Sequence, residues 1–157
     1  MNQVSLNQNV NLSQHFTLGE LTKTKYKTKD GNIPSHVQVE NLKRLCGWLE
    51  HLRSQYNLLY SDGNEPVIIN SGYRSPEVNK KAGGSETSNH LEGCAVDIHC
   101  YGIEQALRYA VILLNYSDNT NKQYDELYIE RSPRGSYWIH LAVRPKDNRR
   151  KTAIIIS

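Results

Sequence analysis

Residues 124–143 have the sequence YDELYIERSPRGSYWIHLAV, and this stretch decides the fold. Two runs within it, 124–130 and 137–143, are rich in β-branched and aromatic residues, which favour extended backbone. The intervening RSPRGS contains Pro and Gly, which favour a loop between strands. The stretch therefore predicts an antiparallel β-hairpin.

Alternation along this hairpin assigns its two faces. Successive side chains of a strand point to opposite sides, so one apolar set should face the core: Leu127, Ile129, Ile139, Leu141 and Val143. The opposite face then carries a second set: Glu126, Tyr128, Glu130, Trp138, His140 and Ala142. If Tyr128 pairs with His140, Glu130 is a diagonal neighbour of that histidine, at roughly 7–8 Å between backbone positions. A carboxylate there could serve as a general base, although an exposed strand glutamate is equally ordinary.

Helical and extended segments alternate through the rest of the chain. Apolar spacing, or a preceding Pro, predicts three helices: 37–56, 77–81 and 103–115. Polar, turn-rich segments should follow the two long helices: 57–66 and 117–122. Short apolar or alternating runs predict three further strands: 67–70, 94–100 and 153–156. Together these segments predict an α+β fold, with a small, mostly antiparallel sheet and helices packed on one side.

The whole chain is expected to form one domain. A length of 157 residues suffices for a single core. Residues 1–11 are expected to be flexible, and residues 12–35 to form an N-terminal arm and a polar loop. In the arm, Phe16, Leu18 and Leu21 are the apolar anchors.

Composition excludes several classes of protein. Charged residues make up 22% of the chain and hydrophobic residues 38%, so neither a disordered chain nor one inserted in a membrane is expected. The mild net charge of +3 does not separate a cell-wall surface from nucleic acid, but the absence of a nucleic-acid motif argues against a nucleic-acid partner. The basic cluster 144–151 is expected to be a solvated turn. A monomer is expected.

The three cysteines, Cys46, Cys94 and Cys100, lack the spacing of a disulfide framework. Reduced and buried side chains are therefore expected.

Residues 71–97, SGYRSPEVNKKAGGSETSNHLEGCAVD, together with the hairpin, carry the residues suited to metal chemistry. His90 and Asp97 lie seven positions apart, and His140 is on the last strand of the hairpin. Two imidazoles and one carboxylate form a suitable zinc set that leaves a fourth position open, as in catalytic sites. A structural zinc site would instead combine His90 with a second group: Cys94, His99 and Cys100. Three ligands on one short strand make that site geometrically awkward.

Several motifs resemble those of the M15 zinc peptidases. They are SGYRS at 71–75, GGS at 83–85, SNHLEGCAVD at 88–97 and WIH at 138–140, preceded by the arm LSQHFTLGEL at 12–21. The likeness is greatest to the short phage and bacterial branch of this family. M15 proteins include D-Ala-D-Ala carboxypeptidases and phage endolysins, and they are related in fold to the hedgehog signalling domain.

The resemblance implies roles for five residues. His90, Asp97 and His140 match the zinc ligands, which implies one Zn²⁺ per chain. Arg74 matches an arginine that stabilises charge near the scissile carbonyl, although a solvent-facing turn arginine is the alternative. Ser88 matches a serine that contacts the substrate.

The catalytic acid departs from the family pattern. Many relatives carry it three residues before the last ligand, where this chain has Tyr137. Tyrosine cannot act as a carboxylate base, so Glu130 is the candidate, by the hairpin geometry and by its likeness to an acid on the same strand in the short branch.

The function implied is hydrolysis of amide bonds in peptidoglycan stem peptides, as a carboxypeptidase or an endolysin-type endopeptidase. Because Met1 to Gln14 lacks the regions of a signal peptide, the protein is expected to be made in the cytoplasm and to act on the wall after release or within a phage particle. The alternative is a zinc-containing wall-binding or phage structural module without turnover, which the departure at Tyr137 favours. Retention of Arg74, Ser88 and Glu130 favours the enzyme.

Overall fold

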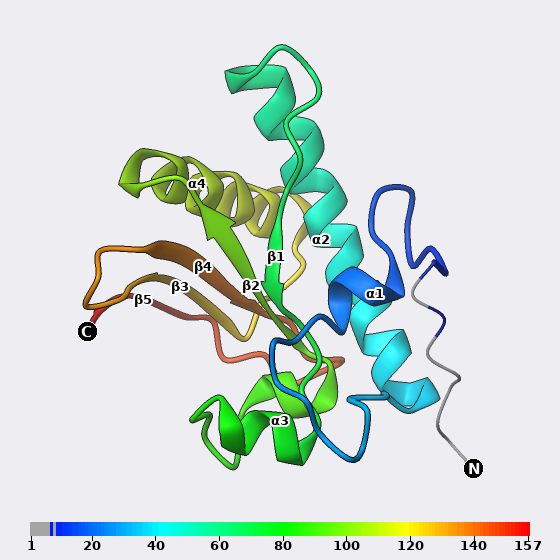
Figure 1. Ribbon diagram of the computed structural model, residues 1–157. Helices are drawn as coiled ribbons and strands as arrows, with labels where there is room; N and C mark the ends of the chain where they lie inside the picture. The colour runs from blue at the N-terminus through cyan, green and yellow to red at the C-terminus, as the bar shows by residue number, and fades with distance from the viewer. Residues whose placement is uncertain (1–6, 8) are drawn as a thin grey trace.

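The computed structural model describes residue 7 and residues 9–157. Its helices are α1 (Leu18–Leu21), α2 (His36–Tyr60), α3 (Pro76–Lys81), the 3₁₀ turn η1 (Asn89–Glu92) and α4 (Ile103–Thr120). Its strands are β1 (Ile69–Ser71), β2 (Ala95–Cys100), β3 (Glu126–Arg131), β4 (Tyr137–Ala142) and β5 (Lys151–Ile156). Figure 1 shows one sheet with the two long helices beside it. The α+β prediction is confirmed.

The sheet has the strand order β1-β2-β4-β3-β5. Every pairing is antiparallel except that of β3 with the edge strand β5. Tyr128 lies opposite His140 on the β3–β4 hairpin, as predicted, and Asp97 of β2 lies opposite the same histidine on its other side. Three neighbouring strands therefore place these three side chains in one row across one face.

The core lies on the other face of the sheet, under α2 and α4. Its strand residues are those assigned by alternation, including Leu127, Ile139 and Leu141, and all are buried. Cys46, Cys94 and Cys100 are buried free thiols, as expected. No helix in the described part of the chain is both long and apolar enough to cross a membrane.

Both long helices extend further than predicted. Residues 57–60 and 117–120 are helical rather than turn-like, because neither segment contains a Gly or Pro that would stop a helix. Buried Asn57 also closes the end of α2, since its Nδ2 donates to the carbonyls of Arg53 and Glu65. Helix α4 ends where Asn121 takes a left-handed conformation with φ 57°.

The N-terminal arm packs as expected. Phe16, Leu18 and Leu21 are all buried in the core. Thr17 and Glu20 form a capping box that fixes the start of α1. Most of the segment 1–11, which was expected to be flexible, lies outside the described residues, namely residues 1–6 and 8.

Strand β1 begins two residues later than predicted. Val67 is buried but unpaired with β2, and the register between the two strands shifts between Ile69 and Ser71. This irregular strand leads into the turn at Gly72. A Cβ at Gly72 would lie 2.2 Å from the Leu21 carbonyl oxygen, so only glycine allows α1 to approach here.

Candidate metal centre

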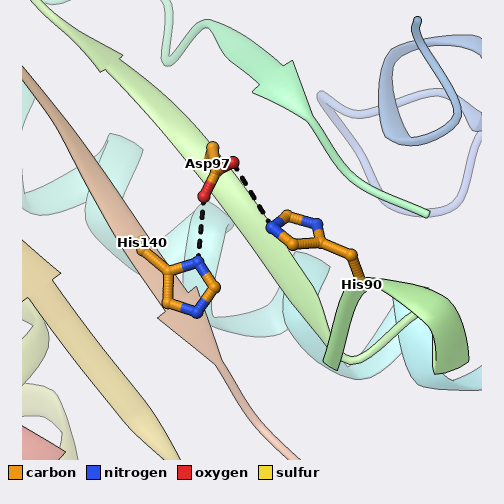
Figure 2. A group of neighbouring side chains, drawn as sticks. All are labelled: His90, Asp97 and His140. Atoms are coloured by element: carbon orange, nitrogen blue, oxygen red, sulfur yellow. Dashed lines mark hydrogen bonds and ion pairs between the residues drawn. The ribbon is translucent and has the colours of Figure 1, made fainter. Parts of the chain in front are cut away.

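His90, Asp97 and His140 converge at one point on the sheet (Figure 2). His90 comes from η1, Asp97 from β2 and His140 from β4. One ligand atom from each residue can be chosen so that all lie within 4.8 Å of one another. His90 is 3% exposed, so the group is largely shielded from solvent. The structure thus brings together the three residues predicted to hold zinc.

The backbone around His90 fixes its tautomer. The Nδ1–H of His90 donates to the Gly72 carbonyl at 2.7 Å, because a carbonyl oxygen can only accept. Ser88 Oγ accepts a hydrogen bond from the His90 backbone N–H and caps the turn. The Nε2 atom of His90 consequently presents its lone pair, and it lies 3.3 Å from Asp97 Oδ2.

His140 lies between two carboxylates. Its Nδ1 is 2.9 Å from Asp97 Oδ1, and its Nε2 is 2.9 Å from Glu126 Oε1. Tyr128 stacks on the imidazole with ring centroids 5.3 Å apart and planes 15° apart. Burial alone would lower the pKa of His140, but the two carboxylates outweigh it and raise that pKa to about 9. Glu126 thus contacts a predicted zinc ligand, and the sequence did not reveal this contact.

This donor set fits a zinc ion. Glu126 can accept a hydrogen bond from the Nε2–H of His140, which leaves the lone pair of His140 Nδ1 free. The lone pairs of His140 Nδ1 and His90 Nε2 can then both bind a metal ion beside Asp97. Burial would raise the pKa of Asp97, but the adjacent imidazoles hold that pKa well below its usual range. One carboxylate and two imidazole nitrogens are usual ligands of zinc. Each imidazole also has its other nitrogen hydrogen-bonded to an oxygen, as is usual for zinc-bound histidines.

The alternative cysteine site is wrong. Within the described residues, the metal-binding group contains no sulfur. The thiols of Cys94 and Cys100 are buried beside backbone carbonyls. His99 lies edge to face against Tyr101, with ring centroids 4.5 Å apart.

A buried network supports the centre from the side of β3. Asn89 Nδ2 donates to Asp125 Oδ2 and to Glu126 Oε1, both at 2.8 Å. Asp125 is fully buried, and Arg149 pairs with both of its carboxylate oxygens, at 2.9 and 2.6 Å. Arg144 donates to the Asn89 side-chain oxygen at 3.0 Å.

Residues 144–151 are largely exposed, as expected, but Arg144 and Arg149 are also ion-paired, which the expectation did not include. Their guanidinium groups compensate the charge of buried Asp125, and both line the cavity over the metal centre. Arg144 follows β4 and lies beside Asp125 through the β3–β4 hairpin, whereas Arg149 reaches Asp125 through the parallel pairing of β5, which the sequence spacing did not indicate.

Glu130 lies in the same cavity but is bonded differently from Glu126. The indole N–H of Trp138 donates to Glu130 Oε2 at 3.1 Å, so Trp138 lines the cavity rather than capping the sheet. Burial and the charge of Asp97 raise the pKa of Glu130. The pKa of Glu126 is instead lowered to about 2, chiefly by its hydrogen bond with His140. Glu126 and Glu130, the two residues of β3 that lie diagonal to His140, therefore differ in basicity.

Tyr137 faces away from this cavity. It lies three positions before His140 on β4, so its side chain is on the opposite face and packs against the core. An acid at this position of this chain would point toward the core rather than the metal centre.

Arg74 is not a solvent-facing turn residue. Its guanidinium donates to Asp97 Oδ2 at 3.2 Å and to Ser71 Oγ at 3.0 Å. Its backbone N–H donates to the His90 carbonyl. Arg74 and Ser88 both line the cavity, which has a volume of about 480 Å³. Both residues predicted to act on substrate therefore border the space above the metal centre.

The Peptidase M15 family matches residues 14–126. This is well over half of the chain, and the chain belongs to that family. The family is one of peptidases, which places the chain among hydrolytic enzymes. Among curated proteins, a search found no match. His140 and Glu130 lie beyond the matched range, so their places in the site depend on the geometry described above.

Proposed function

We propose that the protein is a zinc-dependent peptidase that hydrolyses amide bonds in peptidoglycan stem peptides. The observation that carries this proposal is the convergence of His90, Asp97 and His140 beneath an open cavity in a chain of the Peptidase M15 family. A structural zinc site is closed by four protein ligands, whereas a catalytic one keeps a position free. Three protein ligands at the floor of a cavity support the catalytic kind.

Zinc held there would lower the pKa of water and polarise the scissile carbonyl. Glu130 would accept the proton of the attacking water and pass it to the leaving amine. Its raised pKa supports this role, because a general base works best when its pKa approaches the working pH. Glu126 is a poorer base, since its proton affinity is lowered by the bond to His140.

Arg74 would stabilise the negative charge that develops on the carbonyl oxygen. Its guanidinium is already oriented by Ser71 and Asp97, so little reorganisation is needed during reaction. The cavity is polar and open. Such walls suit a short extended peptide with small side chains, which supports an alanine-containing bond of the stem peptide.

The non-catalytic alternative was favoured because this chain has Tyr137 where many relatives have the catalytic acid. That support weakens because Tyr137 faces the core, while Glu130 occupies the cavity.

Digestion of purified sacculi by the zinc-loaded protein tests the proposal. New amine groups and stem-peptide fragments, identified by mass spectrometry, are expected, with no release of peptides from casein. The chelator-treated protein serves as the control. Casein cleavage with intact sacculi would overturn the substrate, and zinc binding with no cleavage of either would favour a binding module.

A further inference from the structure

The segment between α1 and α2 carries lysines at alternate positions: Lys23, Lys25, Lys27 and Lys29. All four are exposed, whereas the intervening Thr24, Tyr26 and Thr28 are half-buried. Over the described residues, none of the four ammonium groups pairs with a carboxylate. The segment thus forms a basic ridge whose charge the protein leaves uncompensated.

The first two of these lysines line a second cavity, of about 510 Å³. Its cationic lining residues are Lys23, Lys25 and Arg74, and it has no acidic lining residue. Lys23 Nζ donates to the Ile69 carbonyl at 3.3 Å, and Lys25 Nζ lies 5.4 Å from the centre of the Tyr26 ring. The Lys23 ammonium is thus bound by a backbone carbonyl, and the Lys25 ammonium lies near a ring that lines the cavity.

This lysine cavity adjoins the metal cavity. Arg74 and Ala82 line both of them. The side chain of Arg74 reaches from Ser71, which lines the lysine cavity, to Asp97 in the metal centre. A peptide residue in a strand spans about 3.3 Å, so a peptide bound at the metal centre needs few further residues to reach the lysine cavity.

We propose that the lysine cavity is a subsite for a carboxylate-bearing residue of the peptide substrate, close to the scissile bond. This inference rests on the proposed function, and it names the feature of the substrate that the chain selects. Two uncompensated cations and no acid form a wall that favours a carboxylate over a neutral amide of the same shape. In a stem peptide, the α-carboxylate of the γ-linked glutamate is a group of this class.

Paired stem peptides test the subsite. They are identical except that the γ-linked glutamate carries either an α-carboxylate or an α-carboxamide. The zinc-loaded wild-type protein should show kcat/KM about three- to tenfold higher for the carboxylate, the size expected of partly exposed ion pairs. The difference should lie in KM, because the lysines contact a group whose charge does not change during the reaction and so bind the ground state and the transition state equally, and it should shrink at high salt.

The double variant K23Q/K25Q should lose this preference. K27Q/K29Q is the matched control, since it removes two charges from the same ridge but outside the cavity, and it should keep the preference. An equal loss on both peptides in K23Q/K25Q would indicate a general electrostatic attraction and overturn the subsite. Equal wild-type rates on the two peptides would also overturn it while leaving the proposed function intact.

A wild-type protein that binds zinc but cuts neither peptide would overturn the proposed function instead. Calorimetric binding of the same two peptides then decides the subsite. Tighter binding of the carboxylate peptide, abolished only in K23Q/K25Q, supports it. Equal affinities refute it.

Discussion

Replacement of Glu126 by leucine removes the acceptor that holds His140 Nε2. The contact is 2.9 Å long, and the Glu126 side chain is only 18% exposed, so water replaces it poorly. A hydrogen bond to a charged group is worth about 1.5–3 kcal/mol, and about 1.4 kcal/mol is tenfold in a dissociation constant. Glu126→Leu should therefore weaken zinc binding roughly 10–100-fold, the range measured for partners of metal-bound histidines.

The pH of the measurement decides whether this loss is visible. Glu126 stabilises protonated His140 as well as zinc-bound His140, and the pKa of that histidine in the metal-free protein is raised to about 9. Below this pH, protons compete with zinc for His140, and the loss of Glu126 weakens the binding of both the proton and the zinc ion. A zinc series buffered by a chelator, at a pH above that value, isolates the effect on the metal.

Two further variants separate positioning from charge. Glu126→Gln keeps an oxygen that can accept from Nε2–H, so its zinc affinity should lie between those of the wild type and Glu126→Leu. Glu130→Gln should bind zinc as the wild type does, because Glu130 bonds Trp138 rather than His140. If Glu126→Leu binds zinc within twofold of the wild type while remaining folded, Glu126 does not position His140.

Three other predictions concern rate, stability and the metal. Glu130→Gln should retain zinc and lose about 10²–10⁴-fold in kcat, the usual effect of removing a general base; near-full peptide hydrolysis would assign the base elsewhere. Asp125→Asn should lower the free energy of unfolding by about 2–4 kcal/mol, because it breaks a buried ion pair whose arginines still reach water, and denaturant titration measures this. The pKa of Asp125 in the folded protein lies below its ordinary value, through its hydrogen bonds with Arg149 and Asn89 despite burial. The wild-type advantage should thus be full above about pH 4 and disappear as the pH falls through the lower, folded pKa; an advantage independent of pH would contradict the ion-pair explanation. Zinc at a thousandfold excess over its Kd should stabilise the protein by about 4 kcal/mol, seen as a rise of roughly 8–16 °C in melting temperature, and His140→Ala should abolish that rise.

Alternation in the sequence predicted the site-bearing face of the hairpin because the strands are regular. Leu127 and Ile139 could face only the core, which fixed His140 on the opposite side. Its pairing with Tyr128 was an assumed register, and the structure has that register. The metal ligands followed from their residue types, which suit zinc, and from the resemblance of the surrounding motifs to the M15 zinc peptidases.

The buried network was beyond the sequence because its members meet only through long-range topology. Asp125 lies in the predicted strand 124–130 with no sign of a partner for its carboxylate, and Arg149 stands in a basic run that usually lies in solvent. Strand β5 pairs in parallel with β3, and this crossover alone brings the arginine to the aspartate. The helix ends were misplaced for a simpler reason, since neither residues 57–60 nor residues 117–120 contain a Gly or Pro that would stop a helix.

The different roles of the two glutamates follow from their places in the β3–β4 register. Glu126 and Glu130 are both diagonal neighbours of His140, one on each side of Tyr128. Only Glu126 receives a hydrogen bond from the imidazole, and Asn89 donates a second one, so its negative charge is stabilised and its pKa is low. Glu130 is desolvated by burial and lies in the field of Asp97, and these two effects outweigh its hydrogen bond from the Trp138 indole N–H, so its pKa rises. Residues of the same type at symmetric positions thus acquire opposite proton affinities, one suited to holding a zinc ligand in place and the other to accepting a proton.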